Sequence, residues 1–313
     1  MSHTVRQPSA QDEQDLLSQG VTSPSVVTVV HPGWGVRARR LLAPVVKHGL
    51  LMGASLVFLL PFYWMVMSAL KTNTQIFARP MQWWPDTVHW SNLPTTLTYS
   101  QFPYFRLLWN STYYSGAVAI GTVLSCTAVG YGFARLRFPG RDVLFALTLG
   151  TMMIPPIVTF IPTYVLFSKV GLTGTYAPLI IPYFLGNGFF IFMMRQFFMG
   201  LPWDLSDAAR MDGAGEFRIF WEVMLPLVKP ALMVVLVFSL LFTWHDFFGP
   251  LIYLQDRETF PLSLGLYAFR GQRASEWGLI MMGSLLTTLP MIIVFLFTQR
   301  YFLQGVKLSG IKG

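Results

Sequence analysis

Long apolar runs separated by polar connections dominate the chain. Within each run the apolar residues neither alternate nor follow a single stripe, which is typical of helices surrounded by lipid or by other helices. Each run has about the 20 residues that a helix needs to cross a bilayer. The pattern predicts an all-α polytopic membrane protein with six transmembrane helices, at about 46–70, 110–134, 143–168, 176–199, 230–253 and 277–301.

Two details of these runs bear on how the helices pack. Prolines interrupt the third, fourth and sixth runs, and proline removes a helix donor and kinks the axis. In the second run Ala117, Gly121 and Ser125 recur every four residues. Small residues at that spacing let helix backbones approach closely in lipid. We therefore expect kinked helices and a closely packed second span.

Residues 1–40 are polar and rich in Ser, Gln and Pro, with no apolar core followed by a small-residue cleavage site. We expect a disordered cytoplasmic tail rather than a cleaved signal peptide. Residues 41–313 then form one transmembrane domain.

Composition agrees with a membrane protein. Hydrophobic residues make up 53% of the chain and charged residues 12%, whereas soluble domains carry about 25% charge. The net charge of +8 does not indicate nucleic-acid binding, which needs a basic face on a folded module. Most of the 22 Lys and Arg residues lie in the tail and in alternate connections. The positive-inside rule then predicts a multi-pass plasma-membrane protein with both termini in the cytoplasm.

A polar insert at about 200–230 separates the fourth and fifth runs. Asp204 can cap a short helix, with Asp207 as its capping-box partner, and Gly213 fits a left-handed stop. A second helix from Gly215 ends at Leu225-Pro226. Its spacing places four apolar side chains on one face, which would anchor it beneath the bundle: Phe217, Phe220, Trp221 and Met224. We expect a cytoplasmic helix–turn–helix.

Residues 207–214 read D-A-A-R-M-D-G-A, and Leu225-Pro226 and Pro230 follow. This insert resembles the EAA loop of ABC-importer permeases, which reads roughly E-A-A-x-x-D-G-A, then L-P and a further Pro. Asp207 stands where the family usually has Glu, so the acid is kept but shortened by one methylene. In that family the loop docks on the ATPase subunit. An amphipathic hairpin lying on the membrane would explain the apolar face, but not the match. The resemblance implies a coupling role for Asp207, Ala208, Ala209, Asp212, Gly213 and Ala214.

The C-terminal region resembles the ending of maltose-type sugar permeases. It contains Q-R-Y-F at 299–302, G-V-K at 305–307 and G-I-K-G at 310–313. The resemblance implies the permease subunit of a binding-protein-dependent ABC importer of sugars or related polyols. It implies four kinds of partner besides the lipid bilayer: a second homologous permease, two ATPase subunits, an extracytoplasmic binding protein and, through the ATPases, ATP with Mg. The chain itself would bind no cofactor.

No Walker-type phosphate loop, nucleophile elbow or H-E-x-x-H helix occurs in the sequence, and the five histidines are scattered. We therefore expect no catalytic residue and no metal site in this chain. The single cysteine, Cys126, lies in an apolar run and is interpreted as a small core residue.

Three polar residues inside apolar runs are candidates for the substrate path. His245 and Asp246 are adjacent in the fifth run and would point about 100° apart on a helix. A buried acid indicates function because charge burial is costly, so packing, substrate contact and proton relay all stay open. Asn187, between two glycines, could bind a sugar hydroxyl or a neighbouring helix.

Two other classes of protein compete with the ABC permease. An ion-coupled secondary transporter would use Asp246 as its relay. An interfacial scaffold would need no polar path at all.

Overall fold

The computed structural model describes the backbone of residues 34–309 and the side chains of residues 44–300. Most of the predicted tail, and the last residues of the chain, lie outside this range. The first helix, α2, begins at Trp34 and so includes the end of the predicted tail.

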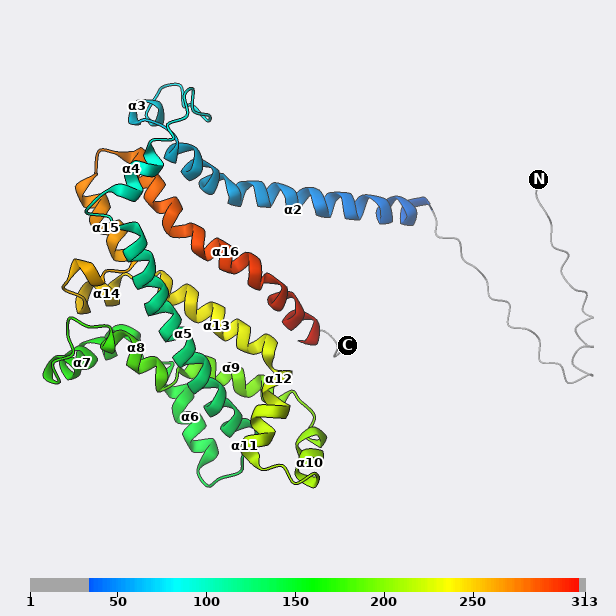
Figure 1. Ribbon diagram of the computed structural model, residues 1–313. Coiled ribbons are helices and arrows are strands. Elements are labelled where there is room, and N and C mark those ends of the chain that lie inside the picture. Colours follow the sequence, from blue (N-terminus) through cyan, green and yellow to red (C-terminus); the bar gives the residue numbers. More distant parts are fainter. Residues whose placement is uncertain (1–33, 310–313) are drawn as a thin grey trace, which may run out of the picture. The chain divides into compact units, whose positions relative to one another are not determined.

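All regular elements within residues 34–309 are helical (Figure 1). A π-helical turn spans Ile219–Met224 and a 3-10 turn spans Arg257–Thr259. The α-helices are α2 Trp34–Ala69, α3 Asn73–Ile76, α4 Asn92–Thr98, α5 Tyr104–Arg135, α6 Arg141–Thr151, α7 Pro156–Lys169, α8 Ala177–Phe184, α9 Gly188–Met199, α10 Asp204–Met211, α11 Glu216–Arg218, α12 Leu225–Leu227, α13 Lys229–Trp244, α14 Phe248–Tyr253, α15 Leu262–Gln272 and α16 Trp277–Ser309.

Within the described residues, four helices are long and apolar enough to cross a membrane. The number is six if each of two bent helix pairs is one span: α6 with α7, and Glu216–Leu227 with α13. The all-α polytopic prediction is confirmed, but the third span is not the continuous helix predicted at 143–168. It consists of α6 and α7, which meet at 97°. Pro155 and Pro156 cause this break, since proline lacks the amide donor and disfavours helix in the residue before it.

The fourth and fifth spans are also interrupted. Residues 185–187 separate α8 from α9, with Gly186 at a φ of +102°. The fifth span, predicted at 230–253, is α13 followed by α14, with residues 245–247 between them. Asp246 accepts a hydrogen bond from the backbone N–H of Gly249 (3.1 Å). Such a local side-chain bond competes with helix continuation.

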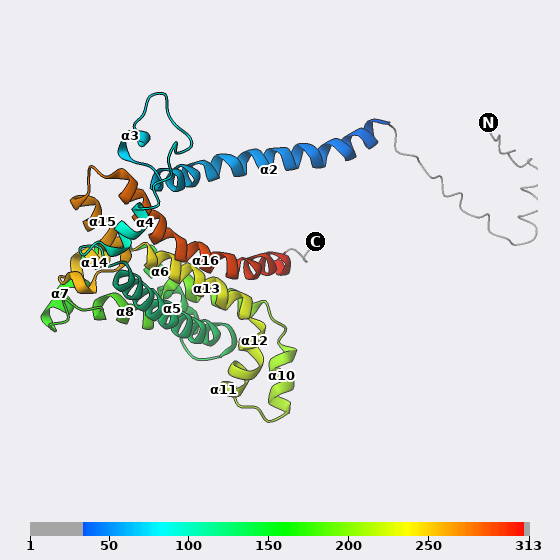
Figure 2. The same cartoon turned by 45° about the horizontal axis from the view of Figure 1, so that its top comes forward.

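The described part of the chain divides into two units, the first ending at Leu60 and the second beginning at Pro61. The second unit is built around α5, which packs against α8, α9 and α13 (Figures 1 and 2). The predicted close approach is found at Gly121, where a Cβ would lie 2.5 Å from the Phe184 ring. It also occurs at Gly130, where a Cβ would lie 2.7 Å from the Cβ of Met194. These glycines let α5 sit against the fourth span.

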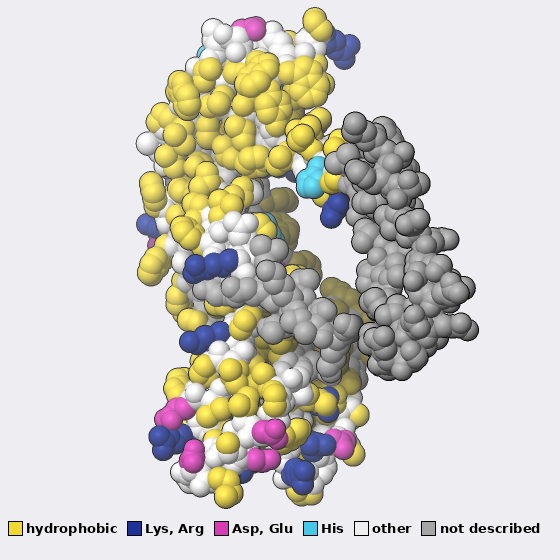
Figure 3. Space-filling model, turned by 90° about the vertical axis from the view of Figure 1, so that its right-hand side faces the viewer, with side chains coloured by type: hydrophobic (Ala, Val, Ile, Leu, Met, Phe, Trp, Pro, Cys, Tyr) yellow, Lys and Arg dark blue, Asp and Glu magenta, His cyan; other side chains and the backbone are white. Residues whose placement is uncertain are grey.

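Side-chain chemistry divides the second unit along its length. Apolar side chains cover most of the face in Figure 3, and acidic and basic side chains gather at the end that carries α10 and α11. This distribution suits a protein whose middle lies in lipid and whose end lies in water.

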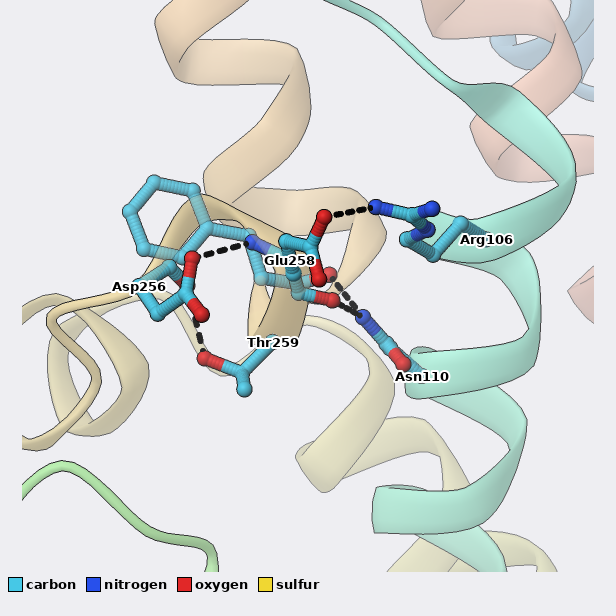
Figure 4. Close-up of polar contacts among 6 residues, drawn as sticks. Arg106, Asn110, Asp256, Glu258 and Thr259 are labelled. Carbon is cyan, nitrogen blue, oxygen red and sulfur yellow. Dashed lines mark hydrogen bonds and ion pairs between the residues drawn. The ribbon is translucent and has the colours of Figure 1, made fainter.

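The opposite end of α5 holds the connection that precedes α15 (Figure 4). Arg106 pairs with Glu258 (2.8 Å), and the Asn110 side chain donates to the carbonyl oxygens of Glu258 (2.7 Å) and Phe260 (3.0 Å). Asp256 accepts from the backbone N–H of Glu258 (2.9 Å) and shapes the turn. The connection is therefore fixed to the second span.

Lys71, which directly follows the first predicted span, has 0% of its surface exposed. Its ammonium donates to the carbonyl oxygen of Gln82 (2.5 Å) and lies 4.9 Å from the Trp64 ring centre. Burial lowers the pKa of Lys71, and the charge of Asp86 partly offsets that effect. Lys71 therefore anchors the connection between α2 and α4 instead of facing water.

Candidate functional site

The predicted helix–turn–helix is present and consists of α10, a turn at 212–215, and α11 with the π-helical turn. We call residues 200–230 the hairpin. Gly213 has a φ of +81°, its N–H donates to the carbonyl of Arg210 (3.0 Å), and the next N–H, of Ala214, donates to the carbonyl of Ala209 (3.0 Å). This bond pair is a Schellman motif. The predicted left-handed stop at Gly213 is confirmed.

The start of α10 differs from the prediction. Asp204 is the first helical residue and not the cap; the cap position is Trp203, which makes no side-chain cap bond. Asp207 is no capping-box partner either, because its carboxylate pairs with Arg210 (2.8 Å). Asp204 and Asp207 both lie inside the first turn of α10. Their negative charges stabilise the positive end of the helix dipole without capping the helix.

The second leg also departs from its predicted face. Met224 is buried and Phe220 is half-buried against the core, but Phe217 is 77% exposed and Trp221 is 56% exposed, their rings stacked at 6.4 Å. The π-helical turn at Ile219–Met224 shifts side chains off the α-helical spacing. The helix also continues through Pro226 to Leu227 instead of ending at Leu225-Pro226.

Apolar side chains of the hairpin are left open. Ala208 is exposed, Leu205 is 38% exposed and Met211 is 89% exposed. Ala209 and Ala214, in contrast, pack against the buried core. Asp212 and Gly213 lie exposed at the turn. Large exposed apolar side chains in one small element are typical of a docking surface.

A polar network closes the hairpin on itself. Arg210 pairs with Asp207 and with Glu216 of the second leg, both at 2.8 Å. The hydrogen bond to Glu216 is the main reason that the pKa of Arg210 is raised. Glu216 also accepts from the hydroxyl of Tyr131 on α5 (3.0 Å). Asp207, Arg210 and Glu216 line a groove of about 850 Å³, together with Trp203 and residues 135–138 at the C-terminal end of α5.

A second cavity, of about 540 Å³, lies where the broken spans meet. We call it the break cavity. Asn187 and Asp246, two of the three predicted path residues, both line it. Its other polar and aromatic lining includes Tyr114, Thr159, Thr163, Tyr183, Thr243 and Tyr253.

Asp246 is held on two sides in the break cavity. Its carboxylate accepts from the hydroxyl of Tyr114 (2.7 Å) and from the N–H of Gly249, while its backbone carbonyl accepts from Ser263 (2.7 Å). The expectation that Asp246 sits on a continuous helix is wrong, because α13 ends at Trp244. His245 occupies the position after that last turn and is not among the residues lining the break cavity.

Asn187 begins α9. Its side-chain oxygen accepts from the N–H groups of Phe189 (3.1 Å) and Phe190 (3.3 Å), and so caps the helix. Its backbone N–H contacts the buried sulfur of Cys126 (3.2 Å), which agrees with the core interpretation of that cysteine. Because the oxygen is occupied, only the amide nitrogen of the Asn187 side chain is left to face a ligand.

Sequence reasoning did not single out Tyr114, Tyr131, Arg135 or Glu216. In the sequence, tyrosines in apolar runs are interpreted as core residues. Arg135, at the end of a span, is interpreted as one of the positive charges that set the orientation in the membrane. Only tertiary contacts show that these groups bond across helices. Among residues 44–300, no cluster of three or more His, Cys, Asp or Glu side chains could hold a metal ion.

Comparison with known proteins gives a consistent result. A family model described as "Binding-protein-dependent transport system inner membrane component" matches residues 126–308. The arabinooligosaccharides transport system permease protein AraQ of Bacillus subtilis (strain 168) is 34% identical over 261 residues, 83% of this chain and 92% of AraQ. The lactose transport system permease protein LacG of Rhizobium radiobacter is 30% identical, covering 88% of this chain and 98% of LacG.

The sn-glycerol-3-phosphate transport system permease protein UgpE of Pectobacterium atrosepticum is also 30% identical, over 84% of this chain and 95% of UgpE. Among solved structures, a bacterial ABC transporter involved in the import of the acidic polysaccharide alginate contains a similar chain. The TM-score is 0.74 at 23% identity, covering 87% of this chain and 100% of that one. That likeness shows the fold.

Proposed function

The chain belongs to the family of binding-protein-dependent transport system inner membrane components, and on that premise we propose that it lines the path of a sugar or related polyol in an ATP-driven importer. It is a multi-pass inner-membrane transport subunit and not itself an enzyme. We place both termini in the cytoplasm, residues 1–40 as a tail and residues 41–313 as the permease domain. The partners are a second permease, two ATPase subunits that bind ATP and Mg, and an external binding protein.

The hairpin is the observation that carries this proposal. It is a rigid element, fixed by the Schellman turn at Gly213 and by the Arg210–Glu216 pair, and it leaves Ala208 and Met211 open to a partner. An ATPase that closes on ATP would displace this element. The exposed apolar surface supplies the contact, and the internal ion pairs keep its shape while it is pushed.

The break cavity suits a polyhydroxylated substrate. Tyrosine and threonine hydroxyls, the Asn187 amide and the Asp246 carboxylate offer hydrogen bonds to substrate hydroxyls, while Phe160 and Tyr253 offer apolar ring faces. The relatives named above are described as transporting arabino-oligosaccharides, lactose and glycerol 3-phosphate, all of them polyhydroxy compounds. Broken helices at the cavity fit alternating access, in which helical bodies rock around a fixed site.

The competing ion-coupled carrier is less well supported. Family membership favours an ATP-driven system. The Asp246 carboxylate already accepts hydrogen bonds from Tyr114 and Gly249. These bonds give Asp246 a structural role that does not require it to carry protons. In right-side-out vesicles that hold a constant internal ATP concentration, substrate uptake should persist when an uncoupler collapses the proton gradient. Complete loss of uptake at unchanged ATP would favour the ion-coupled class.

Purification tests the partners and the substrate together. The tagged chain is purified from its native membrane in mild detergent, and bound proteins are identified by mass spectrometry. We expect a second permease, an ATPase and a binding protein. The binding protein is then assayed by thermal shift against arabino-oligosaccharides, lactose and glycerol 3-phosphate. Isolation of the chain alone, competent for uptake without ATP, would refute the proposed assembly.

A further inference from the structure

We propose that Arg135 and Tyr131 are positioning residues that make the hairpin and α5 move as one body, so that α5 delivers displacement of the hairpin to the wall of the break cavity. The inference rests on the coupling role proposed above for the hairpin. It assigns a function to one buried charge and one hydroxyl that the proposed function does not use.

Arg135, the last residue of α5, is 2% exposed, and no carboxylate pairs with it among residues 44–300. Its guanidinium donates to the carbonyl oxygens of Phe198 (2.6 and 3.1 Å) and Leu201 (2.6 Å). It also lies 4.5 Å from the Trp203 ring centre. A buried charge persists only when such partners satisfy it. Arg135 therefore binds α5 to the segment that enters the hairpin.

Tyr131, one helical turn earlier, holds the other leg. Its hydroxyl donates to Glu216, the first residue of α11, which in turn pairs with Arg210 on α10. Its ring packs against Phe198 (5.5 Å) and Phe220 (4.9 Å). Both legs of the hairpin are thus bonded to one turn of α5 and also to each other. Bonds at both legs oppose rotation as well as translation of the hairpin relative to that helix.

The same helix reaches the break cavity. Tyr114, which bonds Asp246, lies 17 residues before Tyr131 on α5, or about 26 Å along the axis at 1.5 Å per residue. Between them, Ser125 donates to the carbonyl of Tyr183 (3.0 Å), and Cys126 contacts Asn187. These contacts lie at the break between α8 and α9. A shift of α5 must therefore move residues on two sides of the cavity.

The test uses the full complex with its ATPase subunits and binding protein, the latter carrying its endogenous ligand. Arg135→Lys keeps the positive charge but replaces the planar guanidinium with a compact ammonium group. The ammonium group cannot bond both carbonyl oxygens and stack on the Trp203 ring at the same time. Arg137→Lys is the matched control, because Arg137 is exposed two residues away. Tyr131→Phe removes only the hydroxyl and keeps the ring packing.

Spin labels at exposed positions 204 and 105 span the hairpin and the N-terminal end of α5. In wild type and Arg137→Lys, the distance between them should be narrow and equal without nucleotide and with Mg-ATP plus vanadate. In Arg135→Lys the distribution of distances between the two labels should be broader. Binding-protein-stimulated ATP hydrolysis should fall about tenfold or more. Tyr131→Phe should lower that stimulation about fivefold, as expected for one net hydrogen bond.

Arg135→Lys with a narrow distance and wild-type stimulation would overturn the inference while leaving the proposed function intact. Absence of stimulated hydrolysis in the wild-type complex would instead refute the proposed function. Each variant is compared at equal amount in the membrane and equal elution volume in detergent, so that loss of folding is recognised directly.

Discussion

The turn of the hairpin gives the sharpest prediction about coupling. Gly213 has a φ of +81°, and no atom lies within 4 Å of the place where its Cβ would be. A larger residue at this position therefore meets no clash, and its whole effect comes from the backbone. We expect Gly213→Val to leave the protein in the membrane and to abolish binding-protein-stimulated ATP hydrolysis by the complex.

The magnitude follows from the left-handed conformation. A residue with a Cβ costs about 1–2 kcal/mol there, and a β-branched residue lies at or above the top of that range. A cost of about 2 kcal/mol lowers the equilibrium constant for forming the native turn about 30-fold. Gly213→Asn should be much milder, because Asn tolerates the left-handed region.

Gly215 provides a matched control two residues away. It has a φ of −72° and a ψ of 163°, an extended conformation that suits valine, and its Cβ position is also open. Gly215→Val adds the same side chain to the same turn without backbone strain. We expect it to keep most of the stimulated hydrolysis.

The assay is ATP hydrolysis by the purified complex in proteoliposomes, with and without binding protein, for all three variants. The expected order of stimulation is wild type and Gly215→Val, then Gly213→Asn, then Gly213→Val. Equal loss in Gly213→Val and Gly215→Val would show that bulk, and not the turn, matters. Normal stimulation in Gly213→Val would refute the coupling argument itself.

Three further predictions follow. Asp246→Asn should retain part of the transport, since an amide still offers one acceptor and its NH₂ can donate to a hydroxyl; substrate uptake measures this, and complete loss would indicate that the titrating group is needed. Gly130→Ala should destabilise the protein by about 1–3 kcal/mol through overpacking against α9, whereas Gly116→Ala, at an open position, should not; the thermal midpoint in detergent compares them. In a cysteine-free background, a membrane-impermeant thiol reagent should label position 270 and not position 210 on intact cells, and the opposite pattern would overturn the proposed orientation.

The sequence was sufficient for the class of fold and for the hairpin. Run length and composition identify membrane helices because the bilayer thickness fixes the length of a span. Gly213 was predictable because a left-handed stop has a local chemical signature. These features depend on neighbouring residues only, so reasoning from short stretches succeeds.

The breaks and the polar contacts depended on distant residues. The helix α13 ends at Trp244, and Asp246 then bonds Gly249 and Tyr114. No residue near Asp246 in the sequence indicates that Tyr114 is its partner. Arg135 looked like a topological charge because its carbonyl partners come from the end of α9. Phe217 and Trp221 lie exposed, on either side of the start of the π-helical turn at Ile219, and not on the buried face that α-helical spacing predicted. Tertiary bonding decides each of these cases.

The central claim is that the hairpin contacts an ATPase subunit, and site-specific photocrosslinking tests it most directly. A benzophenone amino acid replaces Ala208, which is exposed on α10. In a control protein it replaces Trp84, which is 68% exposed on the connection between α3 and α4. After irradiation of intact membranes, adducts are isolated through a tag on this chain and identified by mass spectrometry. We predict an adduct with the ATPase subunit from position 208 and none from position 84. An ATPase that co-purifies with the chain yet forms no adduct at position 208 would contradict the account.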